Sequence, residues 1–172
     1  MVTLRRRRGI EVVVVTRRGP WPMVALLVMG SLLVPCGALS QNDTSRTLLM
    51  AEALFRIARA EMTKRNFSEA ETHLRRLVGL SFPQGDEKAQ TMLAASYVGL
   101  VDCLVRQTKH DEGLRASQQA LRLPAFSRPS VFRAELYKLM GKIHEAKGDS
   151  SLSVEYFRKA VNMLDSLERR DR

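Results

Sequence analysis

The chain is poor in the residues that build disulfide-rich or metal-binding proteins. Only two of its 172 residues are cysteine, and only three are histidine. Cys36 lies in an apolar segment near the amino terminus, and Cys103 lies far from it in the body of the chain. Two such cysteines give neither a disulfide framework nor a cysteine-based metal motif. For this length we expect one domain, held together by the packing of its secondary structure.

Motifs that carry catalytic chemistry are also missing from the sequence. It has no glycine-rich loop for phosphates and no nucleophile elbow, and its histidines do not have the spacing of metal ligands on one helix. We expect His144 to pack between helices, His110 to cap a helix together with Asp111, and Cys103 to be a small buried residue. The sequence therefore predicts a protein that is not an enzyme and that needs no cofactor or metal.

Acidic residues are scarce only at the start of the chain. Six arginines and one acid, Glu11, fall within the first 18 residues, and 22 basic and 17 acidic side chains follow residue 40. In this body, charges of opposite sign stand four residues apart, as on the solvated face of a helix. The pairs are Glu61 with Arg65, Glu71 with Arg75, Asp111 with Arg115, and Glu155 with Lys159. This mixture does not make the basic stripe of a nucleic-acid-binding surface, so no nucleic-acid partner is predicted.

Residues 1–40 have the pattern of a targeting segment. Arginines precede an uncharged run over 23–34, and small residues follow it, as in a secretory signal peptide cleaved before Gln41 or after Ala38. The same segment could act as an uncleaved membrane anchor over 21–39. A mitochondrial leader is a further alternative, as is lipidation of Cys36, which the preceding proline disfavours. The sequence therefore predicts a secreted or membrane-anchored protein, with a mitochondrial location as the alternative.

After residue 40, a pattern of large and small residues occurs three times. In each copy, a first stretch has a large residue, and then a large and a small residue three and four positions further on. A turn follows this stretch. A second stretch then has a small residue followed by packing residues four and seven positions on. The three copies are Leu54, Ile57, Ala58, Glu61, Ala70, Leu74 and Leu77; Tyr97, Leu100, Val101, Leu104, Gly113, Ser117 and Ala120; and Tyr137, Met140, Gly141, His144, Ser153, Phe157 and Ala160. Small side chains at such positions let two helices approach closely.

This pattern resembles the tetratricopeptide repeat, with spacings of 43 and 40 residues between Ala70, Gly113 and Ser153 in place of the family's 34. Polar Glu61 and large Val101 also depart from the family pattern. The resemblance implies an all-α domain over 41–172, an antiparallel helix-hairpin solenoid of about three repeats. Its six helices are expected at 45–64, 68–80, 86–107, 111–123, 129–147 and 151–169. Asp43, Thr44 and Ser45 are predicted to cap the first helix, and Ser68 with Glu71 to form a capping box on the second.

The resemblance also implies a function. In this family the first helix of each repeat lines a concave surface that holds a peptide or helix of another protein. The corresponding positions here are Glu52, Phe55, Arg59 and Met62; Ala95, Val98, Asp102 and Val105; and Glu135, Lys138, Lys142 and Glu145. The asparagines of the family's chaperone-tail clamp are absent, so we expect a generic acidic or amphipathic peptide.

An alternative function uses the other end of the domain. Solenoids usually end in a polar capping helix, whereas residues 151–169 place Val154, Val161 and Leu164 on the outer face of the last expected helix. This pattern indicates a structural subunit or assembly factor that docks on a partner or on a second copy through 151–169.

Overall fold

The computed structural model describes residues 41–82, 85–170 and 172. The leader predicted for residues 1–40, with its candidate anchor over 21–39 and Cys36, lies outside these residues. Among the described helices, none is both long enough and apolar enough to cross a membrane.

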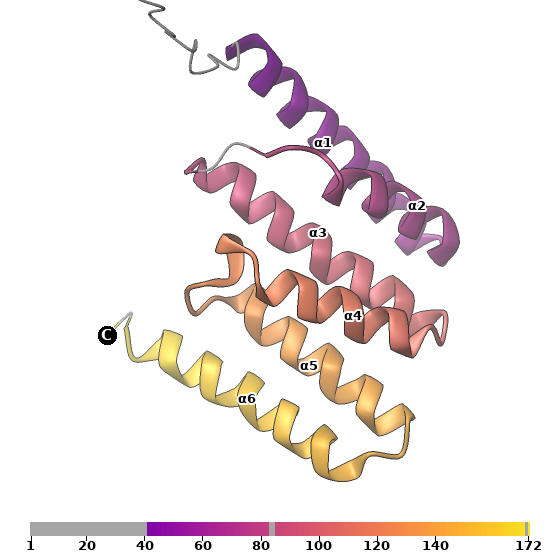
Figure 1. The fold of residues 1–172 in the computed structure, drawn as a ribbon, viewed down its shortest axis with the longest axis vertical. Coiled ribbons are helices and arrows are strands. Elements are labelled where there is room, and N and C mark those ends of the chain that lie inside the picture. Colours follow the sequence, from indigo (N-terminus) through magenta and orange to yellow (C-terminus); the bar gives the residue numbers. More distant parts are fainter. Residues whose placement is uncertain (1–40, 83–84, 171) are drawn as a thin grey trace, which may run out of the picture. The chain divides into compact units, whose positions relative to one another are not determined.

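In the described part of the chain, six α-helices form three antiparallel hairpins that follow one another in sequence (Figure 1). We call the first helix of each hairpin the A helix and the second the B helix. The A helices are α1 (Gln41–Thr63), α3 (Glu87–Arg106) and α5 (Val131–Ala146), and the B helices are α2 (Phe67–Val78), α4 (His110–Leu121) and α6 (Ser150–Glu168). A short 3-10 helix, η1 (Pro124–Phe126), connects the second hairpin to the third. The predicted all-α fold class is confirmed for the described residues.

The three turns between A and B helices share one backbone conformation. Their central residues lie in the left-handed region: Arg65 with φ 65°, Thr108 with φ 60° and Gly148 with φ 82°. In each turn the next amide donates to the carbonyl five residues back, which closes the end of the A helix. These bonds run from Asn66 to Glu61, from Lys109 to Leu104 and from Asp149 to His144. The left-handed residues are 43 and 40 positions apart, so the backbone repeats at the spacing seen in the sequence.

Helices approach closely where the sequence has glycine. A Cβ added at Gly141 of α5 would lie 2.9 Å from the nearest ring atom of Phe157 in α6. A Cβ added at Gly113 of α4 would lie 2.9 Å from Cδ1 of Ile143 in α5. The first contact joins the two helices of one hairpin, and the second joins two successive hairpins. The predicted role of small residues in close packing is thus confirmed at both positions.

The core is divided into three apolar clusters along the stack. One cluster lies between α1 and α2 and contains Ala51, Leu54 and Leu77. The second joins the first hairpin to α3 and contains Ala58, Ala70, Leu74, Leu100, Cys103 and Leu104. The third joins the second hairpin to η1 and α5, with Phe126, Leu136, Leu139 and Ile143 among its members. Because each hairpin buries apolar residues against the next, the hairpins stabilise one another as repeats of a solenoid do.

The predicted caps of the first two helices are wrong. α1 begins at Gln41, so Asp43, Thr44 and Ser45 lie inside the helix. α2 begins at Phe67, and no side chain caps it, because the left-handed turn before it already directs the chain into the helix. The carboxylate of Glu71 instead accepts hydrogen bonds from outside its own helix.

Side-chain caps form on two later helices. The Asp86 carboxylate accepts from the amide of Ala89 at the start of α3. The Ser130 hydroxyl accepts from the amide of Arg133 at the start of α5. Both helices follow a connection between hairpins rather than the tight turn between an A and a B helix, and their first amides need a side-chain acceptor.

Two of the four predicted ion pairs within helices form, and two do not. The pairs that form are Glu71 with Arg75 at 2.7 Å and Glu155 with Lys159 at 2.6 Å. Glu61 pairs with Lys64 rather than with Arg65, because Arg65 has left the helix in the left-handed turn. Asp111 pairs with Lys147 of the following A–B turn at 2.6 Å rather than with its own helix.

Candidate functional site

The A helices lie on the inner side of the stack. α1 lies against α3, and α3 lies against α5, whereas the backbones of successive B helices scarcely approach one another. Helices on the inside of a curved stack are closer together than those on the outside. The surface formed by α1, α3 and α5 is therefore the one on which the sequence resemblance places the candidate residues.

Side chains of α1 and α3 form an open groove on this surface, with a volume of about 490 Å³. Phe55 of α1 and Ala95 of α3, both predicted from sequence, lie in its wall. The other lining residues are Thr91, Met92, Glu87 and Lys88, all from the first half of α3. The lining is mainly apolar, with one acidic and one basic side chain at its end. Such a groove accommodates an apolar side chain of a bound segment.

The remaining α1 candidates differ in how free their side chains are. Glu52 accepts a hydrogen bond at 2.7 Å from Arg56, its neighbour on the next turn. Met62 is half-buried and packs against the cluster between the first hairpin and α3. Arg59 is exposed, and among the described residues its guanidinium has no ion-pair partner. Of the α1 candidates, Arg59 is thus the cation that is available to a ligand.

The α3 candidates mainly serve the core. Val98 and Val105 are half-buried and pack against the cluster around α5. Asp102 accepts a bond from Arg106 at 2.9 Å. Of the four predicted positions in α3, Ala95 is therefore the one that lines the groove.

The α5 candidates form a charged section of the concave face. Glu135 and Lys138 pair with each other at 2.6 Å. Lys142 and Glu145 are exposed, and the structure shows no ion pair for either side chain in the part of the chain it describes. Together with Arg59, Lys142 gives this face a second cation without a partner.

The groove residues that sequence reasoning missed lie one to two turns before Ala95. Met92 precedes it by three residues and Thr91 by four, so both share its face of α3. Their helical spacing was a usable signal. Glu87 and Lys88 contribute because the start of α3 lies beside the middle of α1, which the sequence of α3 alone does not reveal.

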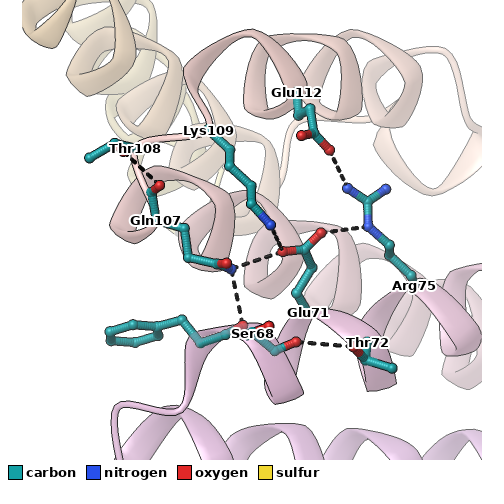
Figure 2. A network of polar contacts seen from close by, with 9 residues as sticks. Ser68, Glu71, Thr72, Arg75, Gln107, Thr108, Lys109 and Glu112 are labelled. Atoms are coloured by element: carbon teal, nitrogen blue, oxygen red, sulfur yellow. Dashed lines mark hydrogen bonds and ion pairs between the residues drawn. The ribbon is translucent and has the colours of Figure 1, made fainter.

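A second cluster of polar side chains surrounds Glu71, where α2 meets the turn between α3 and α4 (Figure 2). The Glu71 carboxylate accepts from Arg75 at 2.7 Å, Gln107 at 2.9 Å and Lys109 at 2.8 Å. Arg75 also donates to Glu112 of α4 at 2.6 Å. Burial raises the pKa of the Glu71 carboxyl, but these donors outweigh that effect and hold the pKa below its usual value. The network joins the first two hairpins.

The candidate chemical residues occupy packing positions. His144 is buried and stacks on Tyr156 with ring centroids 5.3 Å apart and planes 4° apart, as its predicted packing role requires. Cys103 is fully buried, and burial raises the pKa of its thiol to about 12. His110 opens α4 with a buried Nδ1 that has no hydrogen-bond partner in the described structure, so its predicted capping role with Asp111 is wrong. In the described ranges, no group of histidine, cysteine and acidic residues is placed to hold a metal ion.

The two outer faces of the stack are partly apolar. On α6, Val154, Val161 and Leu164 are exposed, as predicted from their spacing. On α1, Leu49 and Ile57 are exposed as well. None of these side chains lines the groove between α1 and α3.

Comparison with known proteins identifies the third hairpin. Residues 134–163, which run from the first turn of α5 to the last part of α6, match the family model described as tetratricopeptide repeat. No curated protein matches the chain significantly.

Proposed function

Since the chain contains a tetratricopeptide repeat, we propose that it is a protein-binding module that holds an acidic, amphipathic peptide or helix on its concave face. The repeat suggests a protein-interaction role in general. The character of the ligand is our inference from the side chains on that face. A second recess of about 390 Å³ lies between α2, α3 and α4, and its walls are less apolar, with Arg75, Glu112 and Arg115 among the lining residues.

The groove between α1 and α3 supports the apolar part of this proposal. Phe55 and Met92 present apolar surface in an open recess, and Ala95 leaves room between them. A leucine or phenylalanine side chain of a ligand would bury its surface there, which stabilises binding by about 1.5–3 kcal/mol for each fully buried side chain.

The unpaired cations support the acidic part. Arg59 and Lys142 are exposed on the same face, at the α1 and α5 sides of the stack. Carboxylates of a ligand that crosses the A helices would meet both. Charges at the margin of an interface set specificity and the rate of association more than affinity.

The test is a selection followed by a charge-matched comparison. Peptides selected from a displayed random library on the full-length chain would be synthesised, labelled and titrated by fluorescence anisotropy. We expect selected peptides to carry acidic residues around apolar anchors. The double variant Arg59→Glu, Lys142→Glu should bind them at least about tenfold more weakly.

The matched control is Arg76→Glu, Arg122→Glu, which makes the same change in net charge at one exposed position in α2 and one directly after α4. It should bind like the wild type, and Phe55→Ala should weaken binding without any change in charge. An equal loss of peptide affinity in both double variants would show that net charge alone, and not the position of the cations, determines binding. Unchanged binding in the first double variant and in Phe55→Ala would place the site elsewhere.

A second proposal concerns delivery of the module. We propose that residues 1–40 carry it across or onto a membrane, on the basis of the arginine-rich start and the uncharged run over 23–34. Intact mass and amino-terminal sequencing of the protein from its native source test this. A start at Gln41 or Leu39 would indicate a cleaved signal. A start at Met1 with retention in carbonate-washed membranes would indicate an anchor, and a start at Met1 in the soluble fraction would refute both.

A further inference from the structure

Inside the stack, each B helix packs on the A helix of the next hairpin. α2 and α3 share an apolar cluster that includes Leu74 and Leu100. α4 and α5 share another, in which Leu114 and Leu121 pack against buried residues that include Leu136 and Ile143. The chain thus contains two copies of the same kind of interface, between a B helix and the A helix that follows it.

α1 carries the A-helix side of this interface without a B helix against it in the described structure. At the spacings of 43 and 40 residues, Ile57 of α1 corresponds to Leu100 of α3 and Met140 of α5. Ile57 is 45% exposed, whereas Leu100 and Met140 are 3% and 2% exposed. Ala53 and Ala60, on the same face, are also exposed. Their equivalents are all fully buried: Ser96, Cys103, Leu136 and Ile143.

α6 carries the complementary B-helix side. Val154 and Val161 correspond to Leu114 and Leu121 of α4, which pack on the cluster around α5. In α6 these two valines are 55% and 56% exposed. One face of α6 therefore carries exposed apolar residues at the positions where α4 has the apolar residues that pack on the next A helix.

The charges match in the same register. Between the first two hairpins, Arg75 of α2 donates to Glu112 of α4 at 2.6 Å. The residue equivalent to Arg75 in the last hairpin is Arg158, and the residue equivalent to Glu112 in the first hairpin is Glu69. Both are exposed, and neither has an ion-pair partner among the described residues. If the last B helix packed beside the first hairpin of another copy, Arg158 and Glu69 would reproduce the bond between Arg75 and Glu112.

We propose that copies of this chain stack end to end, with α6 of one copy packed on α1 of the next and Arg158 paired with Glu69 across the junction. The contact is heterologous, since it joins two different surfaces, and it extends into an open array or closes into a ring. Arg56 is a difference from the inner interfaces, because it stands where α3 and α5 have Gly99 and Leu139. Its guanidinium already bonds to Glu52 at the surface, and a long side chain can lie along apolar surface with its charge in water.

The experiment blocks one surface at a time in the full-length chain. Val161→Glu places a charge on the α6 face, and Ile57→Glu places one on the α1 face. Both positions are exposed in the single chain, so folding should persist, which circular dichroism would check. Mass would be measured by sedimentation equilibrium over a wide range of concentration.

The two variants and their mixture separate the possible modes of association. The wild type should exceed twice the monomer mass at high concentration, and each variant alone should remain monomeric. An equimolar mixture should form a heterodimer of twice the monomer mass and nothing larger, because only one junction between unblocked surfaces remains. Dimers of Ile57→Glu alone would instead indicate pairing of α6 with α6, and would overturn the proposal. A wild type that is monomeric throughout would also overturn it.

The ion pair provides an independent check. Arg158→Glu should weaken self-association, and the double variant Arg158→Glu, Glu69→Arg should restore it, because the charges are exchanged across the junction. If the double variant self-associates as weakly as the single variant, the proposed pairing of Arg158 with Glu69 is wrong. A peptide confined to the groove between α1 and α3 should bind Val161→Glu as it binds the wild type, so failure of stacking and failure of the concave site remain distinguishable.

Discussion

Replacement of Glu71 by glutamine tests whether the polar network between the first two hairpins stabilises the fold. Glu71 is 7% exposed and accepts hydrogen bonds from three donors, one in α2 and two in the turn between α3 and α4 (Figure 2). Glutamine has nearly the same shape, but one of its two acceptor positions becomes a donor. Its amide nitrogen must then face Arg75 or Lys109, so one cation loses its acceptor.

The expected cost is about 2 kcal/mol in the free energy of unfolding. Hydrogen bonds to a charged group contribute about 1.5–3 kcal/mol each when they are well formed. Arg75 and Lys109 are partly exposed, with 48% and 38% of their side-chain surface accessible. Both regain water when their acceptor is lost, and this recovers part of the loss. The expected cost is therefore smaller than the summed contribution of the three hydrogen bonds to the free energy of unfolding.

The effect should depend on pH in a definite direction. The pKa of Glu71 in the folded protein lies below its ordinary value of 4.5. A carboxyl whose pKa is lowered by folding stabilises the native state above its unfolded pKa, and this stabilisation is lost as pH falls through the folded pKa. The difference between wild type and Glu71→Gln should be complete at pH 7 and should begin to shrink below about pH 4.5.

Urea denaturation followed by circular dichroism measures both quantities. Glu145→Gln is the control, because it removes the same charge from an exposed glutamate without a side-chain partner in the described structure. It should change stability little. A cost for Glu71→Gln of less than about 0.5 kcal/mol, or a difference that stays constant down to pH 3, would refute the assignment of stability to this network.

Three further substitutions and one labelling experiment test the helix packing, a turn and the core. Gly141→Ala should destabilise the fold by about 1–3 kcal/mol, because the added Cβ would lie 2.9 Å from a ring atom of Phe157. Gly99→Ala, whose added Cβ would lie 3.4 Å from its nearest neighbour, should be neutral or should stabilise the fold by up to about 1 kcal/mol. Equal effects of the two substitutions in thermal unfolding would contradict this. Thr108→Gly should stabilise by about 0.5–1 kcal/mol, since a β-branched residue is strained at a φ of 60°, and a lower melting temperature would argue against strain in the turn. Cys103 should react with a thiol reagent at pH 8 only as fast as the native state opens, because burial raises its pKa to about 12; rapid labelling of the peptide containing Cys103, seen by mass spectrometry in native buffer, would show that the second core cluster opens.

The fold could be predicted because the repeat requires a small residue, at a fixed spacing along the chain, wherever two helices meet. Gly113 and Gly141 are small where two helices meet, and the meeting point is set by contacts that periodicity makes visible. The turn conformation followed the same spacing, although Arg65 and Thr108 do not have the glycine that would have marked it. Repetition therefore supplied what the individual turn sequences did not.

The polar contacts could not be predicted in the same way. Ser68 and Glu71 have the spacing of a capping box, yet Glu71 bonds to residues 36 and 38 positions away. Asp111 likewise bonds to Lys147, also 36 positions away, rather than to its own helix. Local spacing identifies which residues could pair, but the stacking of hairpins brings a competing partner closer.

The same reasoning explains the candidate groove. Family positions identify one face of each A helix and so select Phe55 and Ala95, which do line the groove. They do not give the shift of one helix along another, which brings Glu87 and Lys88 beside α1. Positions such as Val98 and Val105 are instead taken by the core, because α3 lies between two other A helices and has less free surface.

The proposed stacking would also extend the concave face. α1 and α3, and α3 and α5, are adjacent on that face within one chain. A junction that repeats the packing of a B helix on the next A helix would set α5 of one copy beside α1 of the next. Lys142 of one copy and Arg59 of its neighbour would then lie on one continuous surface. A peptide too short to reach both cations within one chain could meet them across a junction, so such a ligand would bind the array more tightly than the separated copies of Val161→Glu. A peptide confined to the groove between α1 and α3 would bind the array and Val161→Glu equally. The comparison of the two peptides therefore tests whether self-association extends the surface that a ligand can reach.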